Sequence, residues 1–133
     1  MARRSIEELL VAARRRLDRL GPGDAHAAQA GGARLIDIRS RDQIAADGTI
    51  PGALVIARNV LEWRLDPDSA HRHPAAPGLG EAVIVVCNEG YQSSLVAATL
   101  HDMGFALATD LDGGFQAWRE AGLPVDPPTG PAR

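Results

Sequence analysis

The sequence predicts an α/β fold, in which a mostly parallel central sheet is covered by helices on both faces. Short apolar stretches alternate along the chain with segments of helical periodicity, and glycines stand at many of the junctions. Residues 83–86 are apolar at every position, as in a strand that is buried on both sides. Strands that alternate with helices in this way pair in parallel, since each helix carries the chain back across the sheet.

An N-terminal amphipathic helix is predicted ahead of this alternation. The stretch from Ser5 to Glu8 has the pattern of a capping box, and the apolar positions that recur at helical spacing after it are Ile6, Leu9, Leu10, Ala13 and Leu17. Such a face ordinarily covers the protein's own sheet, and self-association is the alternative. The consecutive arginines 14–16 predict a solvated polar side, with a contact patch as the alternative.

The remaining elements follow from periodicity and from the residues that interrupt it. In chain order we expect a short helix at 24–30, a strand at 34–38, a short helix at 41–46, a strand at 53–56, a helical turn at 60–65, a strand at 83–86, a helix at 93–103, a strand at 106–111 and a helix at 114–121. Glycines after several of these helices provide stop signals. Residues 66–80, with three prolines and two glycines, predict the longest irregular connection.

Length and composition bound the organisation and the partners. The chain has 133 residues and 45% hydrophobic content, which suits one globular domain. We expect a helical extension at 1–20, the domain at 21–126 and a flexible tail at 127–133. The net charge of -3 gives no general reason to expect nucleic acid as a partner, and the absence of a long apolar run argues against a membrane. We therefore expect a cytoplasmic protein.

Cys87 is the single cysteine, and it follows the buried strand directly. Ligands of parallel sheets meet the carboxyl ends of strands, where the next helix also points its N-terminus. Backbone amides from Asn88 to Ser94 and the dipole of that helix would stabilise a thiolate, and Gly90 lets the turn close. The alternative is a cysteine that ends a core strand as a small, inert apolar residue.

Four stretches in the same order resemble the rhodanese family of sulfurtransferases, over residues 34–125. They are Asp37-Ile38-Arg39, the segment Gly48 to Ala53, the six residues from Cys87 to Gln92, and the segment Leu111 to Trp118 followed by Ala121 to Val125. The resemblance implies a rhodanese-like α/β domain. It also implies a nucleophile, Cys87, that takes sulfane sulfur from a small donor such as thiosulfate or a persulfide, and passes it on.

The resemblance further implies a site and its partners. Asn88, Glu89, Gly90, Tyr91, Gln92 and Ser93 would surround the substrate. The acceptor would be a thiol or a cyanide-like nucleophile, a sulfur-relay protein is a possible partner, and neither a cofactor nor a metal is expected. Asp37 and Arg39 would pair and fix the turn after their strand.

The chain departs from the family pattern in its charges. Many relatives carry cations directly after the cysteine and at the sixth loop position, where this chain has Asn88 and Gln92, and it adds the carboxylate of Glu89. Thiosulfate is a dianion, so the loop alone suits it poorly. We hypothesise that Arg58 reaches over the loop and replaces the missing cations; the alternative is a solvated Arg58 beside a Trp63 that packs on the core. Thr49, where histidine is usual, predicts only a change in packing or hydrogen bonding.

Two other functions compete with sulfur transfer. A phosphatase of the same fold would use a loop one residue longer that ends in arginine, because phosphoryl oxygens need charge-assisted donors. A module that binds a partner, or that senses oxidation at Cys87, fits the lost cations and the added Glu89. His71 and His73 have no thiol or carboxylate nearby in sequence, so they do not predict a metal site.

Overall fold

The computed structural model describes residues 2–128 of the chain. Its elements are α1 (Ile6–Arg14), α2 (Pro22–Ala30), β1 (Arg34–Asp37), α3 (Arg41–Asp47), β2 (Leu54–Val55), a 3₁₀ turn (Arg58–Val60), α4 (Leu61–Leu65), β3 (Val83–Val86), α5 (Gln92–Asp102), β4 (Ala108–Asp110) and α6 (Gly114–Glu120). Every helix and strand expected from the sequence is present, with ends that differ by a few residues. The irregular connection between α4 and β3 is also confirmed. Most of the tail expected at 127–133 lies outside the described residues.

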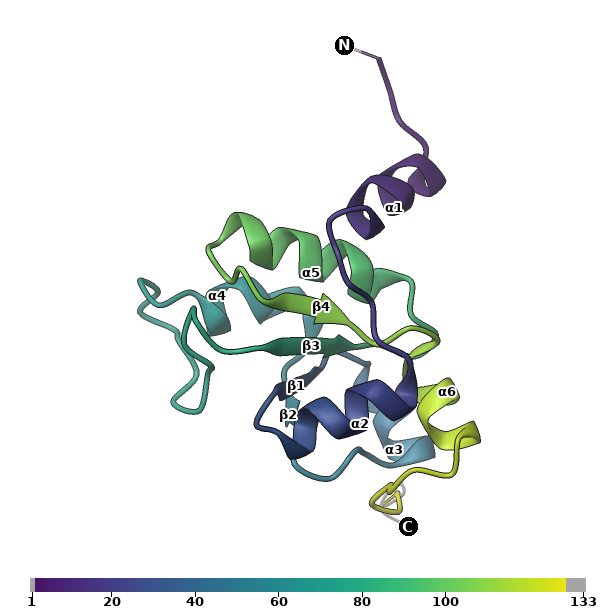
Figure 1. The fold of residues 1–133 in the computed structure, drawn as a ribbon. Coiled ribbons are helices and arrows are strands. Elements are labelled where there is room, and N and C mark those ends of the chain that lie inside the picture. The colour runs from purple at the N-terminus through teal and green to yellow at the C-terminus, as the bar shows by residue number, and fades with distance from the viewer. Residues whose placement is uncertain (1, 129–133) are drawn as a thin grey trace.

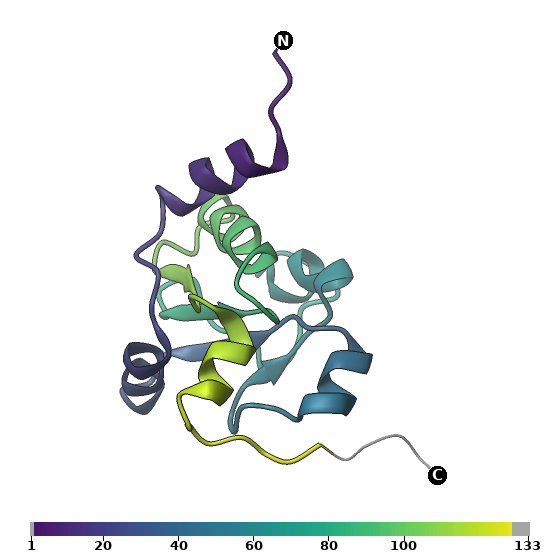
Figure 2. The same cartoon turned by 90° about the vertical axis from the view of Figure 1, so that its right-hand side faces the viewer.

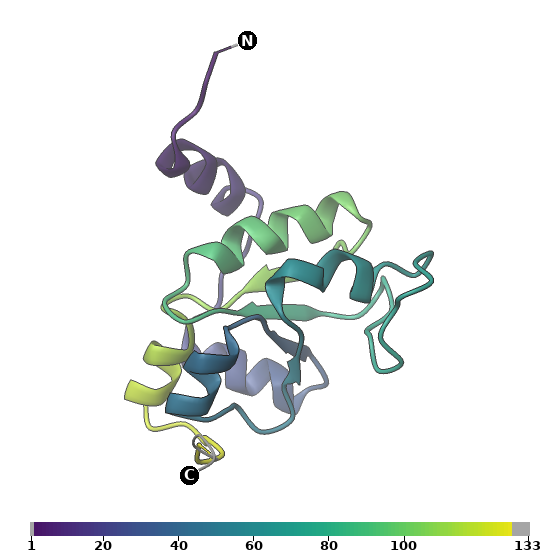
Figure 3. The ribbon, with the colours of Figure 1, turned by 180° about the vertical axis from the view of Figure 1, so that it is seen from behind.

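The four strands form one parallel sheet in the order β2-β1-β3-β4. Figure 1 shows α4 and α5 on one side of this sheet, and α2, α3 and α6 on the other. Figure 3 gives the same arrangement from behind, with the connection from α4 to β3 extending beyond the sheet. The predicted α/β architecture, with helices on both faces, is therefore confirmed.

The strand β3 separates two apolar cores because its side chains alternate between the faces of the sheet. Val83 and Val85 pack with Leu61 of α4 and Leu100 of α5 in the first core. The second core contains Ile84 and Val86 with Ala25, Phe115 and Trp118, among others. With both faces buried, β3 is fixed in position, and so is the residue that follows it.

The N-terminal helix covers α5, not the sheet. Only Leu10 and Ala13 of α1 are buried, whereas Ile6 and Leu9 are exposed. Figure 2 shows α1 lying outside α5, as a further layer on that side of the molecule. The expectation that this helix covers the sheet is wrong, since α5 already occupies that face. The helix begins as predicted, with a capping box between Ser5 and Glu8.

The end of the domain is tied back to the loop before β2. Thr49 and Asp126 form an antiparallel bridge, in which each amide donates to the other residue's carbonyl, at 3.1 and 2.7 Å. These bonds involve only the backbone of Thr49, so the change in packing or hydrogen bonding expected from its side chain stays a prediction. None of the helices in the described part of the chain is long and apolar enough to cross a membrane.

Candidate active site

Cys87 lies at the carboxyl end of β3, at the start of a tight loop that we call the cysteine loop (residues 87–92). The amide of Gly90 donates a hydrogen bond to the sulfur of Cys87 over 3.1 Å. Gly90 has a φ of +88°, and a Cβ at this position would lie 2.8 Å from the backbone nitrogen of Gly113. Glycine is therefore needed both for the backbone conformation and for the close approach, and the turn brings its amide onto the sulfur.

Further donors face the same region from the start of α5. In the part of the chain that the structure describes, the amides of Asn88, Glu89 and Tyr91 have no hydrogen-bond acceptor. Of the first amides of α5, those of Gln92 and Ser93 are also without an acceptor in this part of the chain, whereas that of Ser94 donates to the Tyr91 carbonyl at 3.2 Å. The helix dipole adds partial positive charge there, and free amides in such an arrangement are able to stabilise a negatively charged sulfur or substrate.

The other side of the cysteine loop is held by the start of α6. The amide of Phe115 donates to the carbonyl of Cys87 at 2.8 Å, and the amide of Gln116 donates to that of Asn88 at 3.1 Å. Gly114, with a φ of +63°, approaches so closely that a Cβ would lie 2.6 Å from the Cys87 carbonyl oxygen. The two glycines before Phe115 therefore have a direct role in shaping the loop.

A pocket of about 310 Å³ opens at the cysteine loop. Its lining residues are Gln43, Cys87, Asn88, Glu89, Tyr91 and Gln92. Cys87 lines this pocket although it is only 1% exposed, and it also belongs to the first apolar core. Tyr91 and Glu89 are exposed at its rim. A small molecule that enters the pocket meets one cysteine.

The structure brings together most of the residues that the sequence predicts for the site. Residues 88–92 all belong to the cysteine loop, although the carbonyl of Gly90 faces away toward the N-terminal segment. Ser93 is buried behind the loop, where its hydroxyl donates to Asp110. Arg58 is exposed in the 3₁₀ turn, and it is not among the residues that line the pocket. Trp63 is 59% exposed, so the expectation that it packs on the core is wrong.

Asp37 and Arg39 form the buried ion pair that the sequence predicts. The Arg39 guanidinium donates to both carboxylate oxygens of Asp37, at 2.7 to 3.2 Å, and neither side chain is exposed. Arg39 also donates to the Gly48 carbonyl and lies over the Phe115 ring, 3.7 Å from its centroid. The pair therefore connects β1, the loop before β2, and the start of α6, which supports the cysteine loop.

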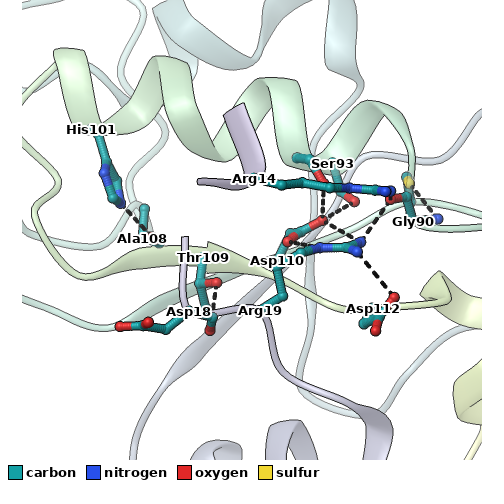
Figure 4. A network of polar contacts seen from close by, with 12 residues as sticks. Arg14, Asp18, Arg19, Gly90, Ser93, His101, Ala108, Thr109, Asp110 and Asp112 are labelled. Carbon is teal, nitrogen blue, oxygen red and sulfur yellow. Dashed lines mark hydrogen bonds and ion pairs between the residues drawn. The ribbon is translucent and has the colours of Figure 1, made fainter. Parts of the chain in front are cut away.

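The structure adds two arginines to the site: Arg14, which the sequence placed on a solvated face, and Arg19, for which nothing was predicted from the sequence. Arg14, from the end of α1, donates to the Gly90 carbonyl at 2.8 Å and to the Ser94 hydroxyl at 3.1 Å. Arg19 donates to the same Gly90 carbonyl, also at 2.8 Å. Figure 4 shows both guanidinium groups converging on Gly90 beside the sulfur. The expectation of a solvated face at residues 14–16 is thus wrong for Arg14, because α1 packs along α5 and directs this side chain toward the start of that helix.

Asp110, at the end of β4, organises the space behind the cysteine loop. Its fully buried carboxylate accepts hydrogen bonds from Ser93 at 2.7 Å and Ser94 at 2.8 Å, and from Arg19 at 2.9 and 3.2 Å. Burial works to lower the pKa of Arg19, but the hydrogen bond and charge of Asp110, with smaller contributions from Asp112 and Cys87, raise it above its ordinary value. Arg19 therefore remains a cation at any pH at which the protein is folded.

The participation of Arg58 stays a prediction with a simple test. If this side chain attracts an anionic donor, Arg58→Ala raises the KM for thiosulfate and the effect shrinks as salt is added, because an exposed charge is screened. Arg41→Ala is the matched control, since Arg41 is exposed in α3. An unchanged KM in Arg58→Ala would remove Arg58 from the site.

Comparison with known proteins agrees with this geometry. The model of the rhodanese-like domain family matches residues 22–121. A thiosulfate sulfurtransferase from Stutzerimonas stutzeri (strain A1501), GlpE, is 37% identical over 101 residues, which cover 76% of this chain and 84% of that protein. The chain therefore belongs to the rhodanese-like domain family, and within it to the rhodanese-type sulfurtransferases.

Two solved structures are similar over most of the chain. A protein of unknown function from Rhodopseudomonas palustris CGA009, described as a possible tyrosine phosphatase, matches with a TM-score of 0.86 and 33% identity, over 95% of this chain and 97% of that one. The polysulfide-sulfur transferase homodimer of Wolinella succinogenes matches with a TM-score of 0.73 and 26% identity, over 88% and 83%. The match with the Rhodopseudomonas palustris protein covers 95% of this chain, a larger share than residues 21–133 make up. It therefore includes part of the N-terminal extension.

Proposed function

We propose that the protein moves sulfane sulfur from a small donor to a thiophilic acceptor through a persulfide on Cys87. The observation that carries the proposal is the hydrogen bond from the Gly90 amide to the Cys87 sulfur, over 3.1 Å, at a pocket that Cys87 lines. The unpaired amides of the cysteine loop and the start of α5 stabilise negative charge on whichever sulfur occupies this place. The chemistry then needs no other acid, base, cofactor or metal.

The reaction takes place in two steps. With thiosulfate as donor, the Cys87 thiolate attacks the outer sulfur, a new S–S bond forms, and the original S–S bond breaks so that sulfite leaves with the electron pair. In the second step a thiolate or cyanide attacks the terminal sulfur of the persulfide, and the Cys87 thiolate is released. Such a covalent intermediate divides the transfer into two easier displacements.

The charge of the pocket bears on the choice of donor. Thiosulfate is supported by the name of the relative from Stutzerimonas stutzeri, whereas a persulfide or polysulfide is supported by that of the protein from Wolinella succinogenes. Glu89 is exposed at the rim of the pocket and repels a dianion more strongly than it repels a singly charged persulfide. A sulfur-relay protein, as donor or acceptor, would meet the same rim.

A mass measurement on the intact protein tests the proposal. We expect a gain of about 32 Da, one sulfur atom, after incubation with thiosulfate, cysteine persulfide or polysulfide, and no gain in Cys87→Ser. With thiosulfate, sulfite should appear in proportion to the adduct. Addition of cyanide should remove the extra mass and release thiocyanate.

Control measurements separate sulfur transfer from the two alternative functions. A protein that gains no mass with any of the three donors, but is oxidised at Cys87 by peroxide, would instead be a binding or redox-sensing module. The observation that favours this second candidate is the charge of the loop, in which Asn88 and Gln92 stand in place of cations and Glu89 adds a carboxylate. Release of phosphate from an aryl phosphate by the wild type, but not by Cys87→Ser, would point to a phosphatase.

A further inference from the structure

We propose that the N-terminal segment from Ser5 to Leu20 is a working part of the sulfur-transfer site, in which Arg14 and Arg19 position the cysteine loop and Arg14 provides the positive charge that the loop lacks. The proposal rests on the sulfur transfer proposed above. It treats both arginines as positioning residues, because they contact the loop backbone and not the reacting sulfur.

The first step of the argument is the attachment of the segment to the domain. Leu20 forms a parallel bridge with Leu111, in which its amide donates to the carbonyl of Asp110 and its carbonyl accepts from the amide of Asp112. The Thr109 hydroxyl donates to the carbonyl of Asp18 at 2.9 Å, and Figure 4 shows this contact at the edge of β4. The segment thus adds to the sheet edge at one end and packs on α5 at the other.

The second step is the double contact at Gly90. Both guanidinium groups donate to the Gly90 carbonyl over 2.8 Å, and hydrogen bonds from cations are stronger than neutral ones. The amide of the same residue donates to the Cys87 sulfur. The carbonyl of Gly90 is therefore held by two cations, while its amide faces the Cys87 sulfur. The segment thus fixes the position of the amide that donates to the sulfur.

The third step concerns the neighbouring peptide group. The Gly90 carbonyl is conjugated with the amide of Tyr91, and hydrogen bonds to the oxygen withdraw electron density from that N–H. The Tyr91 amide has no acceptor among residues 2–128, so it is free to donate into the loop. The hydrogen bonds from the two arginines therefore make the Tyr91 amide a stronger donor, although neither arginine contacts that amide.

The fourth step is the net charge around the loop. Arg19 is balanced by Asp110, which it contacts in two places, and by Asp112 at 3.1 Å. Arg14 forms no ion pair with a carboxylate anywhere in residues 2–128, and its guanidinium lies 5.6 Å from the centre of the Tyr91 ring at the rim. Its charge consequently remains to offset Glu89, where the loop itself has Asn88 and Gln92 in place of cations.

The test compares Arg14→Gln with Arg14→Lys and with two neighbours on the same segment. The first readout is the rate of Cys87 alkylation by iodoacetamide against pH, which detects the thiolate without any sulfur donor; Cys87 is the single cysteine, so the signal is unambiguous. We expect Arg14→Gln to move the midpoint of this profile upward by about 0.5 pH unit, because the loop loses one of the two cations on the Gly90 carbonyl. Arg14→Lys keeps the charge and should stay close to the wild type.

The second readout is steady-state kinetics with the donor that forms the persulfide. Arg14→Gln should lower kcat/KM by about threefold or more, with a larger effect for thiosulfate than for a singly charged persulfide. Arg19→Lys provides a second variant, because it keeps a cation beside Asp110. Arg19→Gln is avoided, since it would leave a buried carboxylate without its partner and could unfold the protein.

Two matched controls separate positioning from mere docking of the helix. Arg15 is exposed, and Arg16 pairs with Asp102 on α5 at 2.6 Å without touching the cysteine loop. Arg15→Gln should change nothing, and Arg16→Gln should weaken the docking of α1 with little effect on the alkylation midpoint. The proposal is overturned if Arg14→Gln has the alkylation profile and kinetics of the wild type, or if Arg16→Gln shifts the midpoint as far as Arg14→Gln does.

The two proposals fail in different ways. If no donor adds sulfur to the wild type but Arg14→Gln still shifts the alkylation midpoint, the sulfur transfer is wrong and the coupling between the N-terminal segment and the loop stands. If sulfur is added normally and all arginine variants behave as the wild type, the segment has no part in the site.

Discussion

Cys87→Ser is expected to reduce sulfur transfer to the uncatalysed background, a loss of at least about 10³-fold in kcat/KM. The reason is chemical: a serine hydroxyl at this position is neither ionised near neutral pH nor able to form a stable bond to sulfane sulfur. The described chain has no other thiol to take over the role. Thiocyanate or thiol-persulfide formation under saturating donor is the measurement.

The variant must also be shown to be folded. Serine is close to cysteine in size, and the contact with the Gly90 amide can be kept by the hydroxyl. The thermal unfolding midpoint should therefore fall by only a few degrees, so a loss of activity cannot be attributed to unfolding. If Cys87→Ser kept more than a few per cent of the wild-type rate, the covalent route would be excluded.

The buried strand β3 and the position of Cys87 at its end could be predicted because their signals are local. Residues 83–86 are apolar at every position, and Cys87 follows them directly, so the carboxyl end of the strand and the turn after it were visible in the sequence. The structure confirms both the strand and the turn, and it confirms the pairing of Asp37 with Arg39, which are two residues apart. In each case the interacting groups lie within a few residues of one another.

The arginines behind the cysteine loop could not be predicted in this way. Arg14 and Gly90 are far apart in sequence, and their contact depends on how α1 packs along α5. Three consecutive arginines are typical of a solvated helix face, and only tertiary packing turns one of them inward. The sole local signal was Asp110, a carboxylate in a strand without another charged residue, which indicates a buried cation nearby without saying which one.

The degree of burial of Cys87 was also beyond the sequence. Its place after β3 predicted only that it lies at the carboxyl edge of the sheet, and the structure shows that 1% of its surface is exposed where it lines the pocket. Gly114 and Phe115 of α6 contribute to this burial, because they pack against the start of the loop. Access for a donor therefore depends on the pocket walls and not on the position of the strand end alone.

Arg39→Ala is expected to cause the largest loss of stability, about 3 to 5 kcal/mol in the free energy of unfolding. The substitution leaves the Asp37 carboxylate fully buried without its cation, and it also removes the contacts of Arg39 with the Gly48 carbonyl and the Phe115 ring. Denaturation by urea, followed by circular dichroism, measures the change in midpoint.

Two further variants identify the cause of that loss. The double variant Asp37→Asn with Arg39→Met leaves no buried charge at this position, so it should recover part of the stability that Arg39→Ala loses. Arg41→Ala, on the exposed start of α3, should stay within about 0.5 kcal/mol of the wild type. Because Phe115 also donates to the Cys87 carbonyl, we expect Arg39→Ala to slow sulfur transfer even where the protein remains folded. A loss of less than about 1 kcal/mol in Arg39→Ala would contradict this account of the pair as the support of the cysteine loop.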